Sequence, residues 1–129
     1  MRARTNRRIE ALAEAIVAFS GYLDPTSALY AARNPGGLLA SSLAHQRDAF
    51  GNRIFSSLLD GWQALLYDLD VKLSGSSKTC LKPTDNLCRL ADTFGKPARF
   101  ASHWAKFVRK ALNDSTVSPD TTLEFFKKG

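Results

Sequence analysis

The stretch 15–40 limits the possible folds most strongly, because it alternates helix signals with stop signals. Up to this stretch, apolar residues recur at intervals of three and four residues, which predicts an amphipathic helix. We expect that helix to begin after a cap at Thr5 or Asn6 and to end near Phe19. Gly21 follows, where the chain can leave the helix in the left-handed conformation.

Two more signals follow in the same stretch. Asp24-Pro25 has the residues of a helix N-cap and first helical position, and predicts a short helix that ends near Arg33. Asn34-Pro35-Gly36-Gly37 then predicts a turn, since proline fixes one φ angle and glycine permits positive φ. Such a turn either brings bare backbone N–H groups close to a ligand or only separates two elements. The sequence leaves both interpretations open.

Ser20 occupies the next position on the apolar face of the first helix, after Ile9, Leu12 and Ile16. A polar group that a helix end carries inward, toward a loop, is typical of a residue that lines a cleft. The alternative is structural, because a serine at a helix end often bonds back to a helix carbonyl.

The rest of the chain predicts helical scaffolding. Residues 38–52 show no clear period, and predict a loop with a short helix or a small hairpin. Ser57 then begins a long central helix, whose wide apolar stripe starts at Leu58 and Leu59. Gly61 lies inside this helix and predicts the close approach of a neighbouring backbone. Three further helices are predicted from a cap or a proline at their start: Thr84, Pro97 and Ser118-Pro119.

The length of 129 residues favours one domain over 1–129, with residues 1–6 as a frayed basic leader. We expect a compact, mainly α fold of about five to six helices and at most a small β-hairpin. The net charge of +6 favours a polyanionic partner: nucleic acid, an anionic membrane surface or the acidic glycan of a cell wall.

No targeting or spanning segment is expected. Glu10 and Glu14 interrupt the apolar run that a signal peptide needs, and no apolar run is long enough to cross a bilayer. The protein is therefore expected to be made in the cytoplasm, and to reach a cell wall or a virion only by another route.

Metal and cofactor sites are not expected either. Cys80 and Cys88 form no CxxC pair and are interpreted as reduced thiols, while His45 and His103 are isolated in the sequence. The basic residues Arg99, Lys106 and Lys110 share one predicted helix, which keeps a nucleic-acid surface open as an alternative to a merely solvated face.

Four short motifs, taken together, resemble a known family. They are Phe19-Ser20-Gly21, Asn34-Pro35-Gly36, Phe55-Ser56-Ser57 with the following Gly61-x-x-Ala64-Leu65, and Ser118-Pro119-Asp120-Thr121-Thr122-Leu123. The chain resembles small phage and mobile-element proteins of the lysozyme-like superfamily, which contains peptidoglycan-cleaving muramidases and lytic transglycosylases. The resemblance implies a helical lysozyme-like fold and a peptidoglycan or related glycan as ligand. It also implies a cleft between the end of the first helix, the 34–37 turn and the loop before Phe55, with Tyr22, Asn34, Gly36 and Gly37 as substrate-binding residues.

The chain departs from this family at one important position. Where lysozyme-like enzymes commonly carry the glutamate that acts as general acid, this chain has Ser20. A hydroxyl cannot protonate a glycosidic oxygen at neutral pH as a carboxylic acid can. The resemblance therefore implies, in this order, a catalytically silent relative that still binds glycan, an engineered loss of the acid, or an acid relocated to Asp24. Asp60 is the other carboxylate to test. The rival function is a basic helical interaction protein that binds nucleic acid or a host protein.

Overall fold

The computed structural model describes residues 5–39, 41, 44, 46–75 and 81–128. Six helices and one two-stranded antiparallel hairpin make up this part of the chain: α1 (Arg7–Ala18), α2 (Ala28–Ala31), β1 (Gln46–Arg47), β2 (Arg53–Ile54), α3 (Leu58–Leu73), α4 (Leu87–Thr93), α5 (Arg99–Leu112) and α6 (Glu124–Lys127). The prediction of a mainly α fold with a small hairpin is confirmed. No helix among the described residues is both long and apolar enough to cross a membrane.

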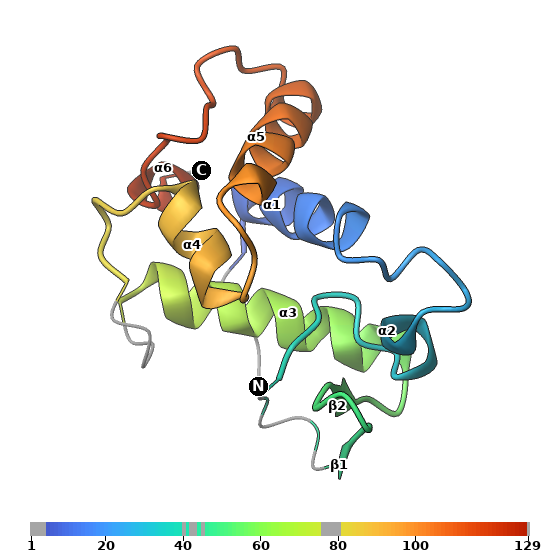
Figure 1. Ribbon diagram of the computed structural model, residues 1–129. Coiled ribbons are helices and arrows are strands. Elements are labelled where there is room, and N and C mark those ends of the chain that lie inside the picture. Colours follow the sequence, from blue (N-terminus) through green and yellow to red (C-terminus); the bar gives the residue numbers. More distant parts are fainter. Residues whose placement is uncertain (1–4, 40, 42–43, 45, 76–80, 129) are drawn as a thin grey trace.

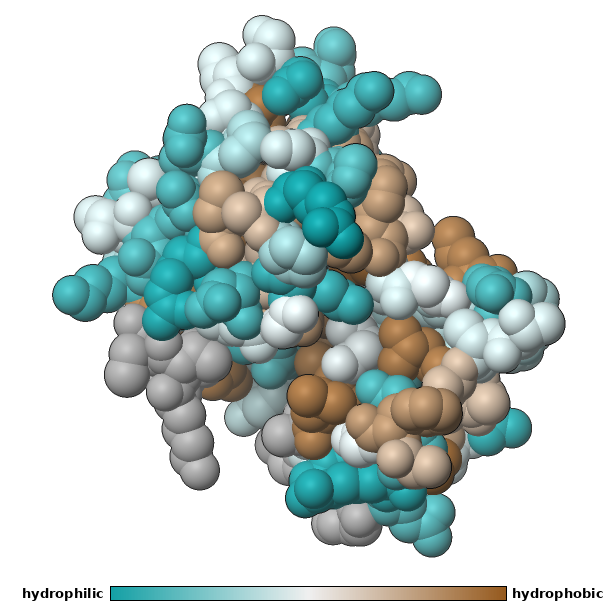
Figure 2. Space-filling model, viewed as in Figure 1, coloured by the Kyte–Doolittle hydropathy of each residue, from teal (hydrophilic) through white to brown (hydrophobic). Residues whose placement is uncertain are grey.

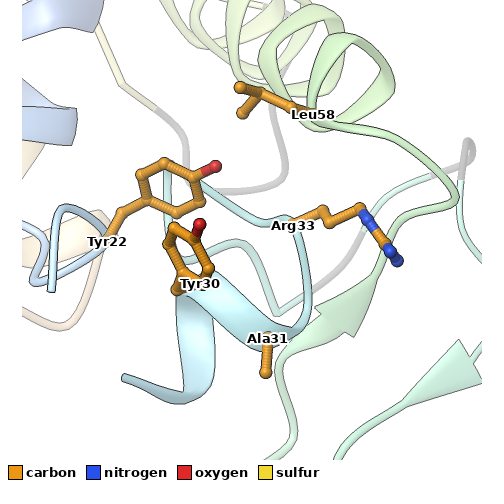
Figure 3. Close-up of a pocket in the computed structure, with 5 residues that line it drawn as sticks. All are labelled: Tyr22, Tyr30, Ala31, Arg33 and Leu58. Atoms are coloured by element: carbon orange, nitrogen blue, oxygen red, sulfur yellow. The ribbon is translucent and has the colours of Figure 1, made fainter. Parts of the chain in front are cut away.

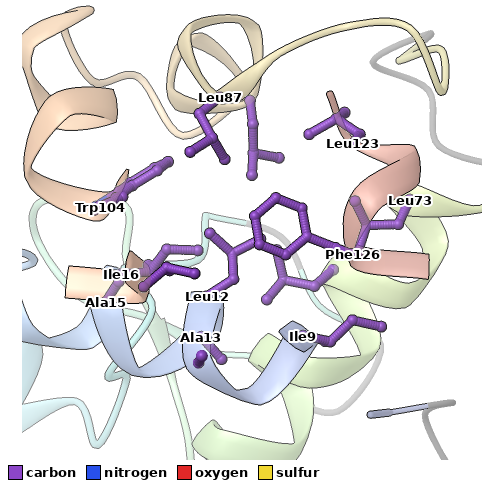
Figure 4. Close-up of a cluster of buried hydrophobic side chains, with 14 of the residues drawn as sticks. Ile9, Leu12, Ala13, Ala15, Ile16, Leu73, Leu87, Trp104, Leu123 and Phe126 are labelled. Carbon is purple, nitrogen blue, oxygen red and sulfur yellow. The ribbon is translucent and has the colours of Figure 1, made fainter. Parts of the chain in front are cut away.

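Helices α3, α5 and α6 pack against α1, and α4 packs against α5. Helix α5 lies along α1, while α3 passes beneath the pair and α4 and α6 close the side (Figure 1). The main core takes large buried side chains from these five helices and includes Leu12, Leu73, Leu87, Trp104 and Phe126 (Figure 4).

A smaller part of the molecule lies at the N-terminal end of α3, where α2 and the hairpin come together (Figure 1). It has its own apolar cluster of Leu38, Ala44, Phe55 and Ala64. Phe94 packs against both clusters and so joins the two parts of the core.

Helix starts follow the expected chemistry, although two caps differ from the prediction. Asn6 caps α1, as expected, by accepting a hydrogen bond from the Ile9 N–H. Ser27, not Asp24, caps α2, and Asn86, not Thr84, caps α4. Each pair lies within three residues and both members are good caps, so the sequence alone could not decide between them.

The central helix starts at the predicted cap. The Ser57 hydroxyl accepts from the Asp60 N–H at 3.1 Å. The buried apolar face of this helix is narrower than predicted, because Leu58 and Leu59 are 50% and 65% exposed. The closing helix starts at Glu124, later than the predicted start at Ser118-Pro119, and Leu123 and Phe126 are buried.

Candidate functional site

The end of α1 leads directly into the candidate site. Gly21 has a φ of +92°, so the chain leaves the helix as predicted. The Ser20 hydroxyl donates to the Val17 carbonyl at 2.9 Å and accepts from the Tyr22 N–H at 3.0 Å. This is the structural alternative for Ser20: its hydroxyl closes the turn after the helix.

A groove of about 400 Å³ begins two residues later. It is lined by Tyr22 from the α1–α2 connection, by Tyr30 and Ala31 of α2, by Arg33, and by Leu58 at the start of α3 (Figure 3). The two tyrosine rings lie 5.6 Å apart between centroids and are tilted by 33°. Their hydroxyls point in the same direction, into the space below Leu58 (Figure 3). The volume is in the range of small-ligand sites.

Gly61 holds the two walls of this groove together. A Cβ atom at Gly61 would lie 2.1 Å from the Arg33 carbonyl oxygen and 2.8 Å from Pro35 Cδ. The predicted close approach of a neighbouring backbone is thus confirmed, and the neighbour is the segment that follows α2. Leu58 lies about one turn before Gly61, so this contact sets the distance between Leu58 and Arg33.

Asn34 supports the groove from behind. It is fully buried, and its side-chain amide donates to the carbonyls of Leu38 and Arg53 while its oxygen accepts from the Leu38 N–H. Asn34 therefore ties the turn to β2. Its burial does not fit the predicted role of a ligand contact.

The two glycines of the turn also serve the fold. Gly36 is buried, and a Cβ there would lie 2.7 Å from Leu65 Cδ1. Gly37 has a φ of +66°, and its N–H donates to the Asn34 carbonyl at 3.2 Å. The turn is thus a packed connection in which the Gly37 N–H is already bonded, and Gly36 offers no surface to a ligand.

The two candidate carboxylates lie in different surroundings. Asp24 is exposed and accepts hydrogen bonds from the backbone N–H and the hydroxyl of Thr26, which lower its pKa. A general acid needs a raised pKa, so this environment does not suit Asp24 for proton donation. Asp60, in the first turn of α3, accepts from the Ser56 hydroxyl at 2.7 Å.

A second pocket lies on the other side of α2. It has a volume of about 310 Å³ and its described lining is mainly apolar: Ala28, Ala31, Ala32, Asp48, Ala49, Phe50 and Ile54. The loop before Phe55 therefore borders this pocket, and not the groove as predicted. Apolar side chains gather over this end of the molecule (Figure 2), and Phe50 is 77% exposed.

Helix α5 presents a different surface. Its charged residues are all basic, and within the described residues none of them is ion-paired with a carboxylate. Arg99, Lys106 and Lys110 are exposed, while His103 stacks on Phe19 at 5.0 Å between ring centroids. The predicted basic face therefore exists and adjoins the end of α1.

Of the predicted binding residues, only Tyr22 lines the groove. Tyr30, Arg33 and Leu58 were missed, since each was interpreted as part of a helix or its end. The sequence contained one indication of Leu58. The pair Leu58 and Leu59 at the start of α3 makes the apolar stripe wider than one buried helix face requires, so one of the two could be expected at the surface.

Comparisons of the chain with protein-family models, curated proteins and solved structures find no match. The lysozyme-like resemblance therefore rests on the motifs quoted above.

Proposed function

We propose that this chain is a lysozyme-like domain that binds peptidoglycan or a related glycan and has lost catalysis. The observation that carries the proposal is the groove beside the end of α1, where Tyr22 and Tyr30 present two neighbouring rings. Aromatic faces with hydroxyl groups and an apolar wall suit a sugar ring, which has both apolar and polar edges. The net charge of +6 suits an anionic wall polymer.

The end of α1 supports the proposed loss of catalysis. Ser20 supplies no carboxylic acid, and its hydroxyl is already engaged in the turn. Asp24 has a lowered pKa, and so is ionised at neutral pH. Neither residue meets the requirement of a general acid for glycoside cleavage.

Retention on insoluble peptidoglycan tests the binding part. The double change Tyr22→Ala and Tyr30→Ala should weaken retention about tenfold, because two ring contacts are removed. Phe50→Ala removes an exposed ring outside the groove and should leave retention unchanged. An equal loss of retention in the double tyrosine variant and in Phe50→Ala would contradict glycan binding by the groove.

Muropeptide release tests the catalytic part. Ser20→Glu should gain measurable cleavage at matched folding, while the wild type and the neutral control Ser20→Gln should not cleave. If wild type cleaves, catalysis has not been lost. If Ser20→Glu stays inactive although it binds glycan, the position does not correspond to the acid of lysozyme-like enzymes.

The basic face of α5 favours a second candidate, an interaction protein that binds nucleic acid. A free basic helix face neutralises phosphates, and such binding weakens steeply with salt. Changing both Lys106 and Lys110 to alanine should reduce the slope of the logarithm of the binding constant against the logarithm of salt concentration by about 2. The same changes at Lys82 and Lys128 should leave this slope unchanged. Salt-tolerant retention on peptidoglycan, with no nucleic-acid binding, would exclude this candidate.

A further inference from the structure

Arg33 occupies a backbone position that normally belongs to glycine. It follows α2, its N–H donates to the Tyr30 carbonyl at 3.1 Å, and the next N–H, of Asn34, donates to the Leu29 carbonyl at 3.0 Å. This is the Schellman arrangement, whose left-handed residue is usually glycine. Arg33 has a φ of +52°, which strains any residue with a Cβ. The chain therefore keeps a long cationic side chain where glycine would fit with less strain.

The fold makes no visible use of that side chain. Other arginines donate to backbone carbonyls: Arg8 to Phe125, Arg53 to Leu39 and Arg109 to Val117. The Arg33 guanidinium has no hydrogen bond or ion pair within the described part of the chain, and the residue is exposed. A strained backbone position whose side chain makes no contact that stabilises the fold points to a functional role.

The groove supplies the surroundings for such a role. Its described lining combines Arg33 with two tyrosine rings and an apolar wall, and contains no acidic residue. The backbone of Arg33 is held in place by its contact with Gly61 and by the buried Asn34, whereas the exposed side chain extends away from the tyrosines (Figure 3).

We infer that Arg33 is the anion-recognising residue of this groove, and that the groove takes a carboxylate-bearing sugar in preference to a neutral one. The inference rests on the proposed glycan-binding function. The sugar ring packs on Tyr22 and Tyr30, and the Arg33 side chain turns from its position in Figure 3 to pair its guanidinium with the carboxylate. Arginine suits this role because its planar fork matches a carboxylate with two parallel hydrogen bonds.

A pair of matched sugars tests the inference. N-acetylmuramic acid differs from N-acetylglucosamine only by a lactyl ether that carries a carboxylate. Calorimetric or NMR titration of the wild-type protein should show about tenfold tighter binding of the acidic sugar. Arg33→Gly should abolish this preference without lowering the urea midpoint of unfolding. Asn113→Gly, at the other left-handed non-glycine residue among those described, should keep the preference.

Each other result of these titrations would overturn a different part of the proposal. An unchanged preference in Arg33→Gly would overturn the role of Arg33, but leave glycan binding by the groove intact. Lactate alone binding as tightly as the acidic sugar would overturn sugar recognition and leave a simple anion site. If the wild type binds neither sugar, the proposed function fails together with this inference.

Discussion

At the scale of single residues, hydrogen bonds within short turns set much of the surface chemistry of this chain. Three aspartates, Asp24, Asp48 and Asp114, accept hydrogen bonds from residues two to four positions ahead, and each has a lowered pKa. At Asp114 the donors are the hydroxyl and the N–H of Thr116, with a smaller contribution from the nearby Arg8 charge. These carboxylates stabilise turns between elements, so the stability of these turns depends on pH.

The first prediction concerns acid stability. Because the pKa of Asp114 is lower in the folded state, its contribution to stability is present above the unfolded pKa of about 3.8 and is lost as pH falls through the lowered value. Asp114→Asn should therefore make the decline in urea midpoint between about pH 5 and about pH 3 shallower than in the wild type. Thr116→Val, which removes one donor, should act in the same direction. Identical acid profiles for all three proteins would show that these bonds do not distinguish the folded from the unfolded state.

At the scale of elements, the decisive contact joins α3 to the segment that follows α2. Helix propensity alone favours alanine over glycine inside a helix by about 1 kcal/mol. The contact reverses this preference, because the Arg33 carbonyl occupies the space that a Cβ at Gly61 would need. Packing between elements therefore outweighs local preference at this position.

The second prediction follows from that competition. Gly61→Ala should lower the free energy of unfolding by roughly 3 kcal/mol, since the clash is with backbone that is itself held by the buried Asn34. Gln63→Ala, at an exposed position of the same helix, should change it by less than about 0.5 kcal/mol. Chemical denaturation of both variants makes the comparison. Equal stabilities would mean that the 34–37 turn moves away from α3 at little cost.

At the scale of the whole molecule, the two ends of the described chain close the core together. The Asn6 side chain donates to the Phe126 carbonyl and Arg8 donates to the Phe125 carbonyl, both at 2.8 Å. The Phe126 ring is fully buried among residues of the main core (Figure 4). Helix α6 is short, but it covers α1 and α3 where they would otherwise be exposed.

The third prediction tests this closure. Phe126→Ala should cost about 3–5 kcal/mol of unfolding free energy, the usual range for a buried phenylalanine. Phe50→Ala removes an equally large but exposed ring and should have little effect. A small effect of Phe126→Ala would show that the core folds without the C-terminal segment.

The sequence by itself determined the local features of this protein. It predicted the mainly α fold, a first-helix cap at Thr5 or Asn6, the left-handed exit at Gly21 and the close contact at Gly61. It succeeded there because helix periodicity, caps and glycine stops depend on residues only a few positions apart.

Only the tertiary structure decided which residues line the groove. Asn34 and Gly36 looked available for a ligand, but β2 and α3 cover them. Leu58 looked buried, but it is 50% exposed. Arg33 and Tyr30 come to the groove because the segment that follows α2 packs against Gly61 of α3. Burial of a residue depends on which distant element packs over it, and that information is not contained in the residues beside it.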